Sequence, residues 1–438
     1  MRPKGLLVAV GLLAVLGGLV WWSNKNQAAA SKKSTDTTTK IVSIPDDQMQ
    51  EIRIRKAGAE PIELKREGGK WLITAPKPFA ADPDATSSLV SSLGSVAADK
   101  TIDDNASDLA EYGLNAPALD ITVTKKDGKP EELLIGADTL NNSGAYAKRA
   151  GDPHVYTVAS FTKTGLDKGL NDLRDKRLLT FDSDKLTRVD LQAKGQQVEF
   201  GKNGANEWQI VKPRPLRADS SQVDTLVTKL KDAKMDLTNP DADAAKKFAG
   251  ASRIATASVT DAGGTQSLEV RQDKDKNYFA KSSSVEGVYK IGSDVGDAFN
   301  KSLDDFRNKK LFDFGFSDPS KVEIGTGGAT YTKSGDKWML GAKAMDNASV
   351  QNLIDKLRDL TATKFVEKGG GAPVFQATVT SNGGKRVEKV VITKQGEQYF
   401  GQREGESGIY ELDKAAVEGL QKAAGEVKEA APEVQKKK

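Results

Sequence analysis

Few side chains in this sequence could carry out catalysis. The 438 residues include no cysteine and one histidine, His154, which excludes thiolate chemistry and any histidine-rich metal site within this chain alone. His154 follows Asp152 and Pro153 in a predicted loop, where it could act as a lone general base or ligand. The sequence suggests no partners for such a role, so we favour a solvated loop histidine.

Ser160 and Lys163 form an S-x-x-K pattern, which overlaps the K-T-G pattern of residues 163–165. Both patterns occur in penicillin-recognising enzymes, but there they lie on separate elements of the active site. A second S-x-x-K, at 334–337, falls within a predicted hairpin turn. The pattern therefore arises readily in a chain rich in serine and lysine, and we interpret both as chance matches.

Two pairs of neighbouring aspartates, Asp103-Asp104 and Asp304-Asp305, could bind a cation or transfer protons. Neighbouring side chains point apart on a helix, so solvated surface is the favoured interpretation. The sequence has no P-loop, H-E-x-x-H or EF-hand motif, and the glycines at 369–371 precede a predicted strand rather than a helix. We therefore predict no catalytic, cofactor-binding or metal-binding residues, no cofactor, and no enzymatic activity.

Aromatic and basic residues offer two further candidates for binding. Tryptophans and tyrosines recur at equivalent places, at Trp71, Trp208 and Trp338 and at Tyr156, Tyr289 and Tyr410. They could line sites for sugars or peptides, but packing in a duplicated core is favoured because aromatic residues dominate core energetics. The basic clusters Arg174–Arg177 and Arg307–Lys310 could face an acidic partner or lipid headgroups, although solvated helix ends are favoured.

The elements that position these residues form an internal repeat of about 130 residues. Each copy begins with a strand that contains the tryptophan, at 70–73, 207–210 and 337–340. An aspartate that can cap a helix follows each strand, and these residues are Asp82, Asp219 and Asp346. The same order of landmarks in three places predicts three copies of one unit.

A helix is predicted after each aspartate, because apolar residues spaced i, i+3, i+4 and i+7 share one helix face. These residues are Leu89, Val90 and Leu93; Val223, Leu226, Val227 and Leu230; and Val350, Leu353, Ile354 and Leu357. Each helix leads to a hairpin with a glycine-containing turn, at 127–128, 263–264 and 382–384, and then to a second strand pair. Closing helices are predicted at Asp172–Leu179 and Asp305–Phe312, whereas the third copy runs out in Ala415–Lys428.

Strands joined by such short turns must pair antiparallel. We therefore predict an α+β fold of three tandem repeats, each a mostly antiparallel sheet with packed helices, behind an N-terminal transmembrane helix. The predicted segments are a membrane anchor at 1–24, a flexible linker at 25–40, repeat units at 41–182, 183–316 and 317–430, and a charged tail at 431–438.

The N-terminal segment carries the clearest indication of location. Leu6–Trp22 is a run of seventeen residues without charge, and as a helix it would cover about 25 Å, slightly less than a bilayer core of about 30 Å. The alternative is a signal peptide cleaved near the alanines at 28–30, but the run is longer than the usual apolar region of about 7 to 15 residues. We expect a single-pass protein of the cytoplasmic (inner) membrane with its body in the periplasm.

The charge distribution excludes a general nucleic-acid-binding surface. The formal charge is +4, and residues 1–40 alone contribute +5, which leaves the other 398 residues at −1. A body near neutrality does not provide a phosphate-binding surface through its overall charge. We expect no nucleic acid among the partners.

The chain resembles the bacterial family built from the domain called DUF4340. The resemblance is carried by the repeated tryptophan strands and by the segments Pro76–Asp82, Pro213–Asp219, Tyr112–Pro117 and Asp172–Leu179. The resemblance covers most of residues 41–430 and is strongest in the first two units. Similar proteins are often encoded beside ABC-transporter components of the gliding-motility type, which implies an accessory role at the cell envelope. The resemblance implies no catalytic residues.

We therefore expect a membrane-anchored, extracytoplasmic and non-enzymatic protein. Its repeated units would act as an interaction or accessory module of an envelope complex, with ABC-transporter-type proteins as partners and the membrane contacted through Leu6 to Trp22. The alternative is a periplasmic module that binds a glycan or a peptide through the repeated aromatic residues. A hydrolase using Ser160 or His154 is the third possibility.

Overall fold

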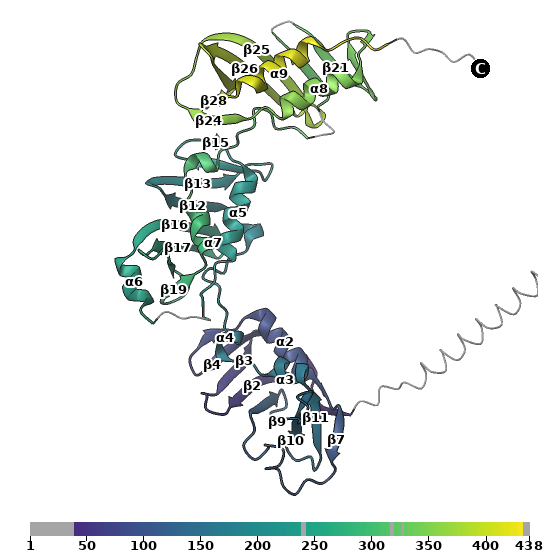
Figure 1. Ribbon diagram of the computed structural model, residues 1–438, viewed down its shortest axis with the longest axis vertical. Coiled ribbons are helices and arrows are strands. Elements are labelled where there is room, and N and C mark those ends of the chain that lie inside the picture. Colours follow the sequence, from purple (N-terminus) through teal and green to yellow (C-terminus); the bar gives the residue numbers. More distant parts are fainter. Residues whose placement is uncertain (1–38, 238–241, 316–318, 326–327, 432–438) are drawn as a thin grey trace, which may run out of the picture. The chain divides into compact units, whose positions relative to one another are not determined.

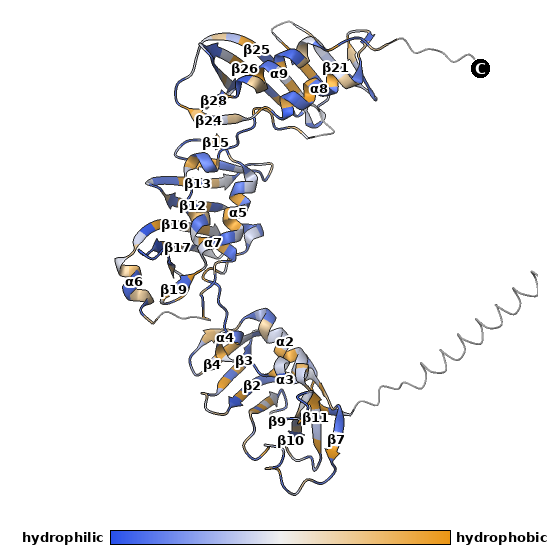
Figure 2. Ribbon diagram, viewed as in Figure 1, coloured by the Kyte–Doolittle hydropathy of each residue, from blue (hydrophilic) through white to orange (hydrophobic). Residues whose placement is uncertain are grey.

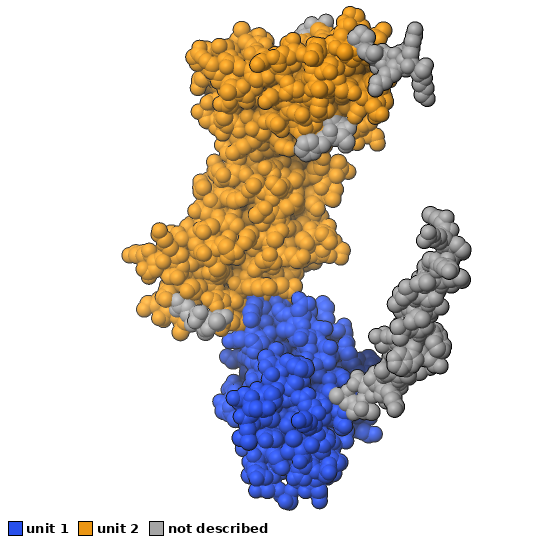
Figure 3. Space-filling model, turned by 45° about the vertical axis from the view of Figure 1, so that its right-hand side comes forward, with its two compact units in different colours: residues 1–176 blue, residues 177–438 orange. Residues whose placement is uncertain are grey.

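The computed structural model describes residues 39–237, 242–315, 319–325 and 328–431 (Figure 1). The chain divides between Lys176 and Arg177 into two compact units, which Figure 3 colours separately. Unit 1 contains one large sheet, and unit 2 contains two. All strand pairs in these sheets are antiparallel, as the short predicted turns require.

Unit 1 is built on a nine-stranded sheet in the order β5-β4-β3-β2-β8-β9-β10-β11-β7, and β1 and β6 form a separate pair. The strands are β1 Lys40–Ser43, β2 Met49–Lys56, β3 Ile62–Glu67, β4 Lys70–Ala75, β5 Phe79–Ala80, β6 Ser95–Ala97, β7 Lys100–Asp103, β8 Leu119–Lys125, β9 Pro130–Asp138, β10 Gly144–Arg149 and β11 Val155–Ala159. The helices are η1 Asp46–Gln48, α2 Pro83–Gly94, α3 Ser160–Leu166 and α4 Leu170–Leu173.

The first sheet of unit 2 has eight strands in the order β15-β14-β13-β12-β16-β17-β18-β19. The strands are β12 Arg188–Ala193, β13 Gln196–Lys202, β14 Trp208–Lys212, β15 Leu216–Arg217, β16 Ser252–Asp261, β17 Gly264–Gln272, β18 Tyr278–Ser282 and β19 Val288–Ile291. The helices are η2 Ser183–Lys185, α5 Ser220–Lys231, α6 Ala244–Gly250, α7 Ser293–Phe299 and η3 Leu303–Asp305.

The second sheet of unit 2 has nine strands in the order β23-β22-β21-β20-β25-β26-β27-β28-β24. The strands are β20 Lys321–Ile324, β21 Thr330–Ser334, β22 Lys337–Leu340, β23 Lys343–Ala344, β24 Ala362–Val366, β25 Ala372–Ser381, β26 Arg386–Gln395, β27 Gln398–Arg403 and β28 Ile409–Leu412. The helices are α8 Asn347–Arg358, η4 Asn382–Gly384 and α9 Lys414–Gly425.

Each large sheet has its own hydrophobic core, formed where an amphipathic helix packs on one face. Alternation of hydrophobic and hydrophilic residues along the strands is visible in Figure 2 and directs one set of side chains to the helix side. In α2, the buried face consists of Thr86, Leu89, Val90 and Leu93. The Asp82 carboxylate accepts from the N–H groups of Asp84 and Ala85, which begins the helix as the sequence predicts.

The equivalent helices α5 and α8 confirm the predicted spacing. The buried residues of α5 are Val223, Leu226, Val227 and Leu230, and those of α8 include Val350, Leu353, Ile354 and Leu357. Asp219 and Asp346 cap the two helices with their carboxylates. The predicted hairpins are also present, as β8–β9, β16–β17 and β25–β26.

The predicted α+β class is wrong, because the fold is mostly β. Strands hold 44% and helices 22% of the described residues, in four antiparallel sheets. The repeated helices were identified correctly, but none of the described helices exceeds twelve residues, whereas each large sheet has eight or nine strands. Short edge strands such as β5, β15 and β23 have too few residues to show an alternating pattern in the sequence.

The two predicted closing helices are also wrong. The helical turns end at Leu173 and at Asp305, and the residues that follow, up to Leu179 and Phe312, are not helical. Arg174, Arg177, Arg307 and Lys310 each form an isolated β-bridge with another segment. Pairing with neighbouring backbone therefore overrides the local helical preference of these charged segments.

The predicted transmembrane helix is not part of the described fold. Among the described residues, no helix is both long enough and apolar enough to cross a membrane. The stretch Leu6–Trp22, nearly all of the predicted linker and nearly all of the charged tail lie outside the described residues.

Candidate functional site

His154 belongs to a small polar cluster in unit 1. Its Nδ1 lies 2.6 Å from Oδ1 of Asp152, whose Oδ2 accepts from the Tyr156 hydroxyl at 3.1 Å. Burial opposes ionisation of Asp152, but the backbone N–H and ring of His154, together with Tyr156, hold the pKa of this carboxyl below its usual value. These contacts tie the loop at 150–154 to the start of β11, so His154 is a loop residue as predicted but has a carboxylate partner instead of being simply solvated.

The Ser160 and Lys163 pattern does not form a catalytic pair. Both residues lie on α3, where the Lys163 ammonium pairs with Asp138 at 2.5 Å and the Ser160 backbone carbonyl accepts from the Thr164 hydroxyl. The aspartate pairs also have local partners. Asp103 accepts from Asn105 and Tyr112, and Asp305 accepts from the N–H and hydroxyl of Ser302.

The repeated aromatic residues are mostly core residues. Trp208 and Trp338 are buried, and the Trp208 indole N–H donates to Asp224 at 2.8 Å. Trp71 is half-buried beneath the guanidinium of Arg66. Tyr156 and Tyr410 are buried as well, whereas Tyr289 is only half-buried. Packing therefore accounts for the repeated tryptophans.

A polar cavity in unit 2 has a volume of about 680 Å³. Its walls come from the β13–β14 turn, β15, the start of α5, the segment after η3, and the start of β26. The volume lies in the range of about 300 to 1,000 Å³ that is usual for ligand sites. The chain therefore places residues from both sheets of unit 2 around one recess.

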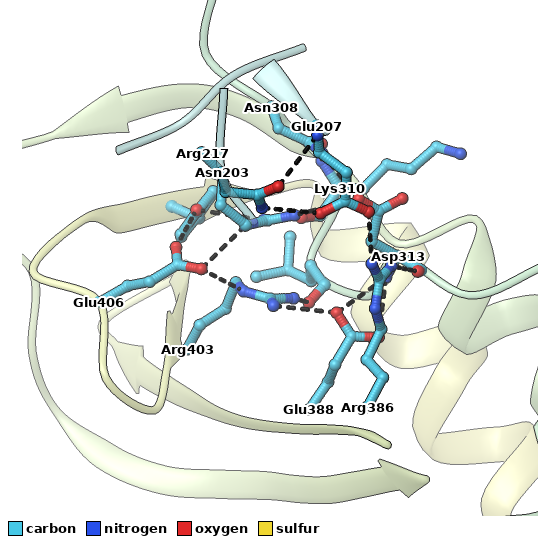
Figure 4. A network of polar contacts seen from close by, with 12 residues as sticks. Asn203, Glu207, Arg217, Asn308, Lys310, Asp313, Arg386, Glu388, Arg403 and Glu406 are labelled. Carbon is cyan, nitrogen blue, oxygen red and sulfur yellow. Dashed lines mark hydrogen bonds and ion pairs between the residues drawn. The ribbon is translucent and has the colours of Figure 1, made fainter. Parts of the chain in front are cut away.

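Seven charged residues linked by ion pairs form what we call the charged cluster, which Figure 4 shows from close by. They are Glu207, Arg217, Asp313, Arg386, Glu388, Arg403 and Glu406. All of them except Glu406 line the cavity itself. Arg217 comes from β15 of the first sheet, and Arg403 comes from β27 of the second. Both converge on Glu406, which follows β27.

Arg217 and Arg403 share one carboxylate oxygen. Oε1 of Glu406 accepts from Nε of Arg217 at 2.8 Å and from Nε of Arg403 at 2.7 Å. Arg217 also donates to the backbone carbonyl of Lys310, and Arg403 donates to that of Leu311. The two guanidinium groups therefore bind the same acid, Glu406, and also hold the backbone of the segment that follows η3.

Glu388 completes the buried side of the charged cluster. Its side chain is 4% exposed, and it accepts from Nη2 of Arg403 at 2.9 Å and from the backbone N–H of Asp313 at 3.0 Å. A carboxylate buried this deeply requires a cation and hydrogen-bond donors, because burial of an unpaired charge is costly. Arg403 and Asp313 supply both.

Burial and ion pairing act against each other on the ionisable groups here. Burial favours the neutral form of Glu406, but Arg217 and Arg403 hold its pKa below the ordinary glutamate value. Burial raises the pKa of Tyr410, whose hydroxyl donates to Oε2 of Glu406 at 2.7 Å. Burial opposes the charge of Arg403, but Glu406 and Glu388 raise its pKa. These groups therefore stay charged or, for tyrosine, neutral at physiological pH.

Arg386 and Glu207 form the outer, more exposed part of the charged cluster. Nη2 of Arg386 lies 2.7 Å from Oε1 of Glu207, and Nη1 donates to the Asp313 carbonyl at 2.5 Å. The Asn203 side chain and Arg386 hold the pKa of Glu207 below its usual value. This pair joins the β13–β14 turn of the first sheet to β26 of the second.

The arrangement is suited to binding rather than to proton transfer. The arginines have fixed carboxylate partners, so neither sign of charge is poised to exchange a proton during a reaction. In the part of the chain that the structure describes, no group of three His, Asp or Glu residues is arranged to hold a metal ion. The cavity instead offers fixed charges, amides and hydroxyls to a polar partner.

Sequence reasoning missed the charged cluster. Arg217 and Glu406 are 189 positions apart, and no periodic pattern connects residues so distant. Of the predicted basic clusters, Arg307–Lys310 lies beside the cavity, but Arg307 is buried over the Phe365 ring at 3.5 Å rather than solvated. A comparison between the repeats could have found the site, because Arg403 and Glu406 occupy the places of Ser282 and Val285.

One family model, described as domain of unknown function (DUF4340), matches the chain twice, over residues 71–207 and 208–376. Each match begins at a tryptophan of the predicted repeat. No curated protein matches the chain significantly. No solved structure does so either.

Proposed function

Because the chain belongs to the DUF4340 family, whose domain has no assigned function, we propose its role from its own structure and sequence. The proposed role is that of a non-enzymatic, extracytoplasmic interaction protein, accessory to an envelope complex of the ABC-transporter type. In this proposal, the cavity of unit 2 is the surface that receives the partner.

The observation that supports this proposal most directly is the construction of the cavity. Two sheets of unit 2 contribute to its walls, and two ion pairs of the charged cluster join them, Arg217–Glu406 at 2.8 Å and Arg386–Glu207 at 2.7 Å. Preformed recesses with fixed polar groups are typical of binding sites, because little ordering is needed when the partner arrives.

A non-enzymatic role is supported by the way in which the candidate catalytic residues are occupied. Lys163 pairs with Asp138 instead of activating Ser160. The carboxylates of the charged cluster are neutralised by arginines. A hydrolase would need one of these groups free to act on a substrate.

The proposed location is supported by sequence alone. The uncharged stretch Leu6–Trp22, preceded by Arg2 and Lys4, has the composition of a membrane-embedded segment. We propose that this stretch holds the chain at the cytoplasmic membrane, with the body in the periplasm. Accessibility of the body to protease in spheroplasts tests the side of the membrane on which it lies.

Co-purification of the full chain from mild detergent, after cross-linking in cells, tests the interaction role. Lys309 and Lys310 line the cavity and are exposed, so Lys309→Glu with Lys310→Glu changes the cavity surface without disturbing a core. The matched control is Lys274→Glu with Lys276→Glu, which are exposed in the β17–β18 turn. We expect envelope proteins to be recovered with the wild type and the control and to be lost with the cavity variant.

Equal recovery with the two variants would remove the cavity from the proposal, and recovery of the chain alone in all cases would remove the interaction role itself. The alternative of glycan or peptide binding through the tryptophans is not favoured, because Trp208, although it lines the cavity, is only 6% exposed. Trp208→Ala is therefore expected to destabilise unit 2 by about 3 to 5 kcal/mol instead of abolishing binding in a stable protein.

A further inference from the structure

Two large apolar side chains of unit 1 are exposed to an unusual degree. Leu140 is 101% exposed and Phe161 is 79% exposed, more than any other large hydrophobic residue that the structure describes as exposed. The next is Val387 of unit 2, at 63%. Single exposed apolar residues are common on soluble proteins, so the placement of these two decides whether they matter.

Leu140 and Phe161 lie at the same end of the unit 1 sheet. Leu140 is in the loop that joins β9 to β10, and Phe161 is in the first turn of α3, directly after β11. The Ser160 backbone N–H donates to the carbonyl of Ser143 in that loop at 3.1 Å. The ammonium of Lys163 then reaches Asp138, at the end of β9. These two contacts hold the loop beside the helix, so we call Leu140 and Phe161 the apolar tip.

The loop presents Leu140 in an ordered conformation. The Asn141 side-chain oxygen accepts from the Thr139 hydroxyl at 2.8 Å and from the N–H and hydroxyl of Ser143 at 3.2 and 2.8 Å. The Asn142 backbone N–H donates to the Thr139 carbonyl. An ordered loop of this kind loses little conformational freedom when its exposed side chain is buried by a partner.

The chain joins unit 1 close to the apolar tip. The Thr39 carbonyl accepts from the N–H of Ala98, and the N–H of the next residue, Asp99, donates to the carbonyl of Thr157 in β11. Thr157 is two residues before the end of β11, which is a distance of about 7 Å along the strand. Thr39, the first described residue, therefore lies near the end of the sheet that carries Leu140 and Phe161.

We propose that the apolar tip inserts into the surface of a lipid bilayer. This inference rests on the proposed function, in which Leu6–Trp22 holds the chain at a membrane. Residues 23–38 separate that stretch from Thr39 and can extend to about 50 Å, so the apolar tip can reach the bilayer to which the chain is attached. Attachment makes the contact intramolecular, and two side chains that bind lipid weakly on their own then suffice.

The shape and charge of the apolar tip favour lipid over a folded protein partner. A protruding side chain can enter a folded partner only where that partner has a matching pocket, whereas a fluid bilayer surface adapts to any protruding group. The nearest charged pair, Lys163 and Asp138, is mutually neutralised at 2.5 Å. The residues at 141–143 are uncharged, so little repulsion opposes the approach to anionic headgroups.

The absence of cysteine permits a direct test with single labels. The full chain is reconstituted into vesicles of phosphatidylcholine and phosphatidylglycerol, with an environment-sensitive fluorophore on Leu140→Cys, Phe161→Cys or the control Lys274→Cys in the β17–β18 turn. All three side chains are exposed, so the variants should keep the circular dichroism and melting temperature of the wild type. We expect nitroxide-labelled lipids to quench labels at 140 and 161 at least twofold more strongly than the label at 274.

Two results would overturn the inference, and they are distinguishable. If the chain floats with the vesicles but quenching at 140 and 161 equals that at 274, membrane attachment stands and the apolar tip does not insert. If the chain does not float with the vesicles at all, the proposed attachment fails and the inference fails with it. The full chain with Leu140→Ser and Phe161→Ser should still float with the vesicles. A label on Asn142→Cys, an exposed neighbouring position, should be quenched when Leu140 and Phe161 are present and should lose that quenching in the double serine variant.

Discussion

Unit 2 holds two segments against its two sheets in the same way but with different side chains. The first linking segment, Arg177–Phe181, packs on the β16–β19 sheet, and the second linking segment, Lys310–Phe314, packs on the β25–β28 sheet. Each begins with an isolated β-bridge, and the backbone N–H of the leucine that follows donates to a backbone carbonyl. Leu178 donates to Ala233 at 2.8 Å, and Leu311 donates to Leu360 at 3.0 Å. The backbone framework is therefore the same in both places.

The side chains that hold the two linking segments differ in charge. Ser282, the last residue of β18, donates to the carbonyl of Leu178, and Arg403, the last residue of β27, donates to that of Leu311. In the strand that pairs with each of these, the third residue accepts from a backbone N–H of the linking segment. This residue is Gln266 in β17, which accepts from Thr180, but Glu388 in β26, which accepts from Asp313. A neutral set therefore suffices to hold such a segment.

The charged set has a consequence that the neutral set lacks. Arg403 also pairs with Glu406, and Glu406 pairs with Arg217, which belongs to the other sheet of unit 2. Val285, in the place of Glu406, packs against the core of the first sheet. The charges at the second linking segment therefore couple the edge strand β15 to β27 and contribute to the walls of the cavity.

Arg403→Leu should have the largest effect, because it leaves the buried carboxylate of Glu388 without its cation. Removal of one partner from a buried pair typically costs about 3 to 5 kcal/mol of unfolding free energy. The matched change, Ser282→Ala, removes one neutral hydrogen bond and should cost about 1 kcal/mol. Urea unfolding gives the totals, and hydrogen exchange in β26 and β27 against β17 and β18 localises them. Equal losses for the two variants would contradict the comparison.

A triple variant that converts the second set into the first should restore most of this loss. Arg403→Ser, Glu388→Gln and Glu406→Val together remove both buried acids along with the arginine that pairs with them. Arg217 loses Glu406 but is 20% exposed and keeps Asp313 at 3.8 Å. Replacement of a buried ion pair by neutral groups is often nearly neutral in free energy, and we expect a deficit of about 1 to 2 kcal/mol relative to the wild type. A triple variant no more stable than Arg403→Leu, measured by the same urea unfolding, would show that charge is required at this segment.

Much of the fold could be predicted from the sequence because its signals are local. The spacing of Leu226, Val227 and Leu230 identifies α5, and the glycine-containing turns identify the hairpins. The closing helices were predicted wrongly because Arg307 and Lys310 form bridges with residues far away in the sequence. Such pairing leaves no periodic trace in the segment itself.

The candidate site could not be predicted for a related physical reason. Arg217 lies on a two-residue edge strand, and its partner Glu406 lies in the turn before β28, so neither has a local pattern that marks it as partly buried. Charged residues are usually solvated, and the sequence offers that interpretation for each of them separately. The indication in the sequence is a difference between two repeats. The third repeat has Arg403 and Glu406 where the second has Ser282 and Val285, which suggests that the two charges pair with each other.

Glu406→Gln should have an intermediate effect that depends on pH. The pKa of Glu406 is held below its ordinary value by Arg217 and Arg403 against the effect of burial, so its charge stabilises the folded state above the unfolded pKa of about 4.3. That contribution is lost as the pH falls through the lower folded pKa. We expect a deficit of about 1 to 2 kcal/mol at pH 7 that shrinks below about pH 4. Urea unfolding over this range measures it, and a deficit independent of pH would exclude the ion pairs as its cause.

Gln266→Ala should have the smallest effect and defines the neutral side of the comparison. The Gln266 side chain accepts from the Thr180 N–H at 2.8 Å and donates to the Thr180 carbonyl at 3.1 Å, at a partly exposed position where water can replace it. We expect a loss of about 0.5 to 1.5 kcal/mol. The matched Glu388→Ala leaves Arg403 without one of its two acids and the Asp313 N–H without its acceptor, so its loss should be severalfold larger. Similar losses in urea unfolding would mean that the two linking segments are held equally, whatever the charge of the side chains.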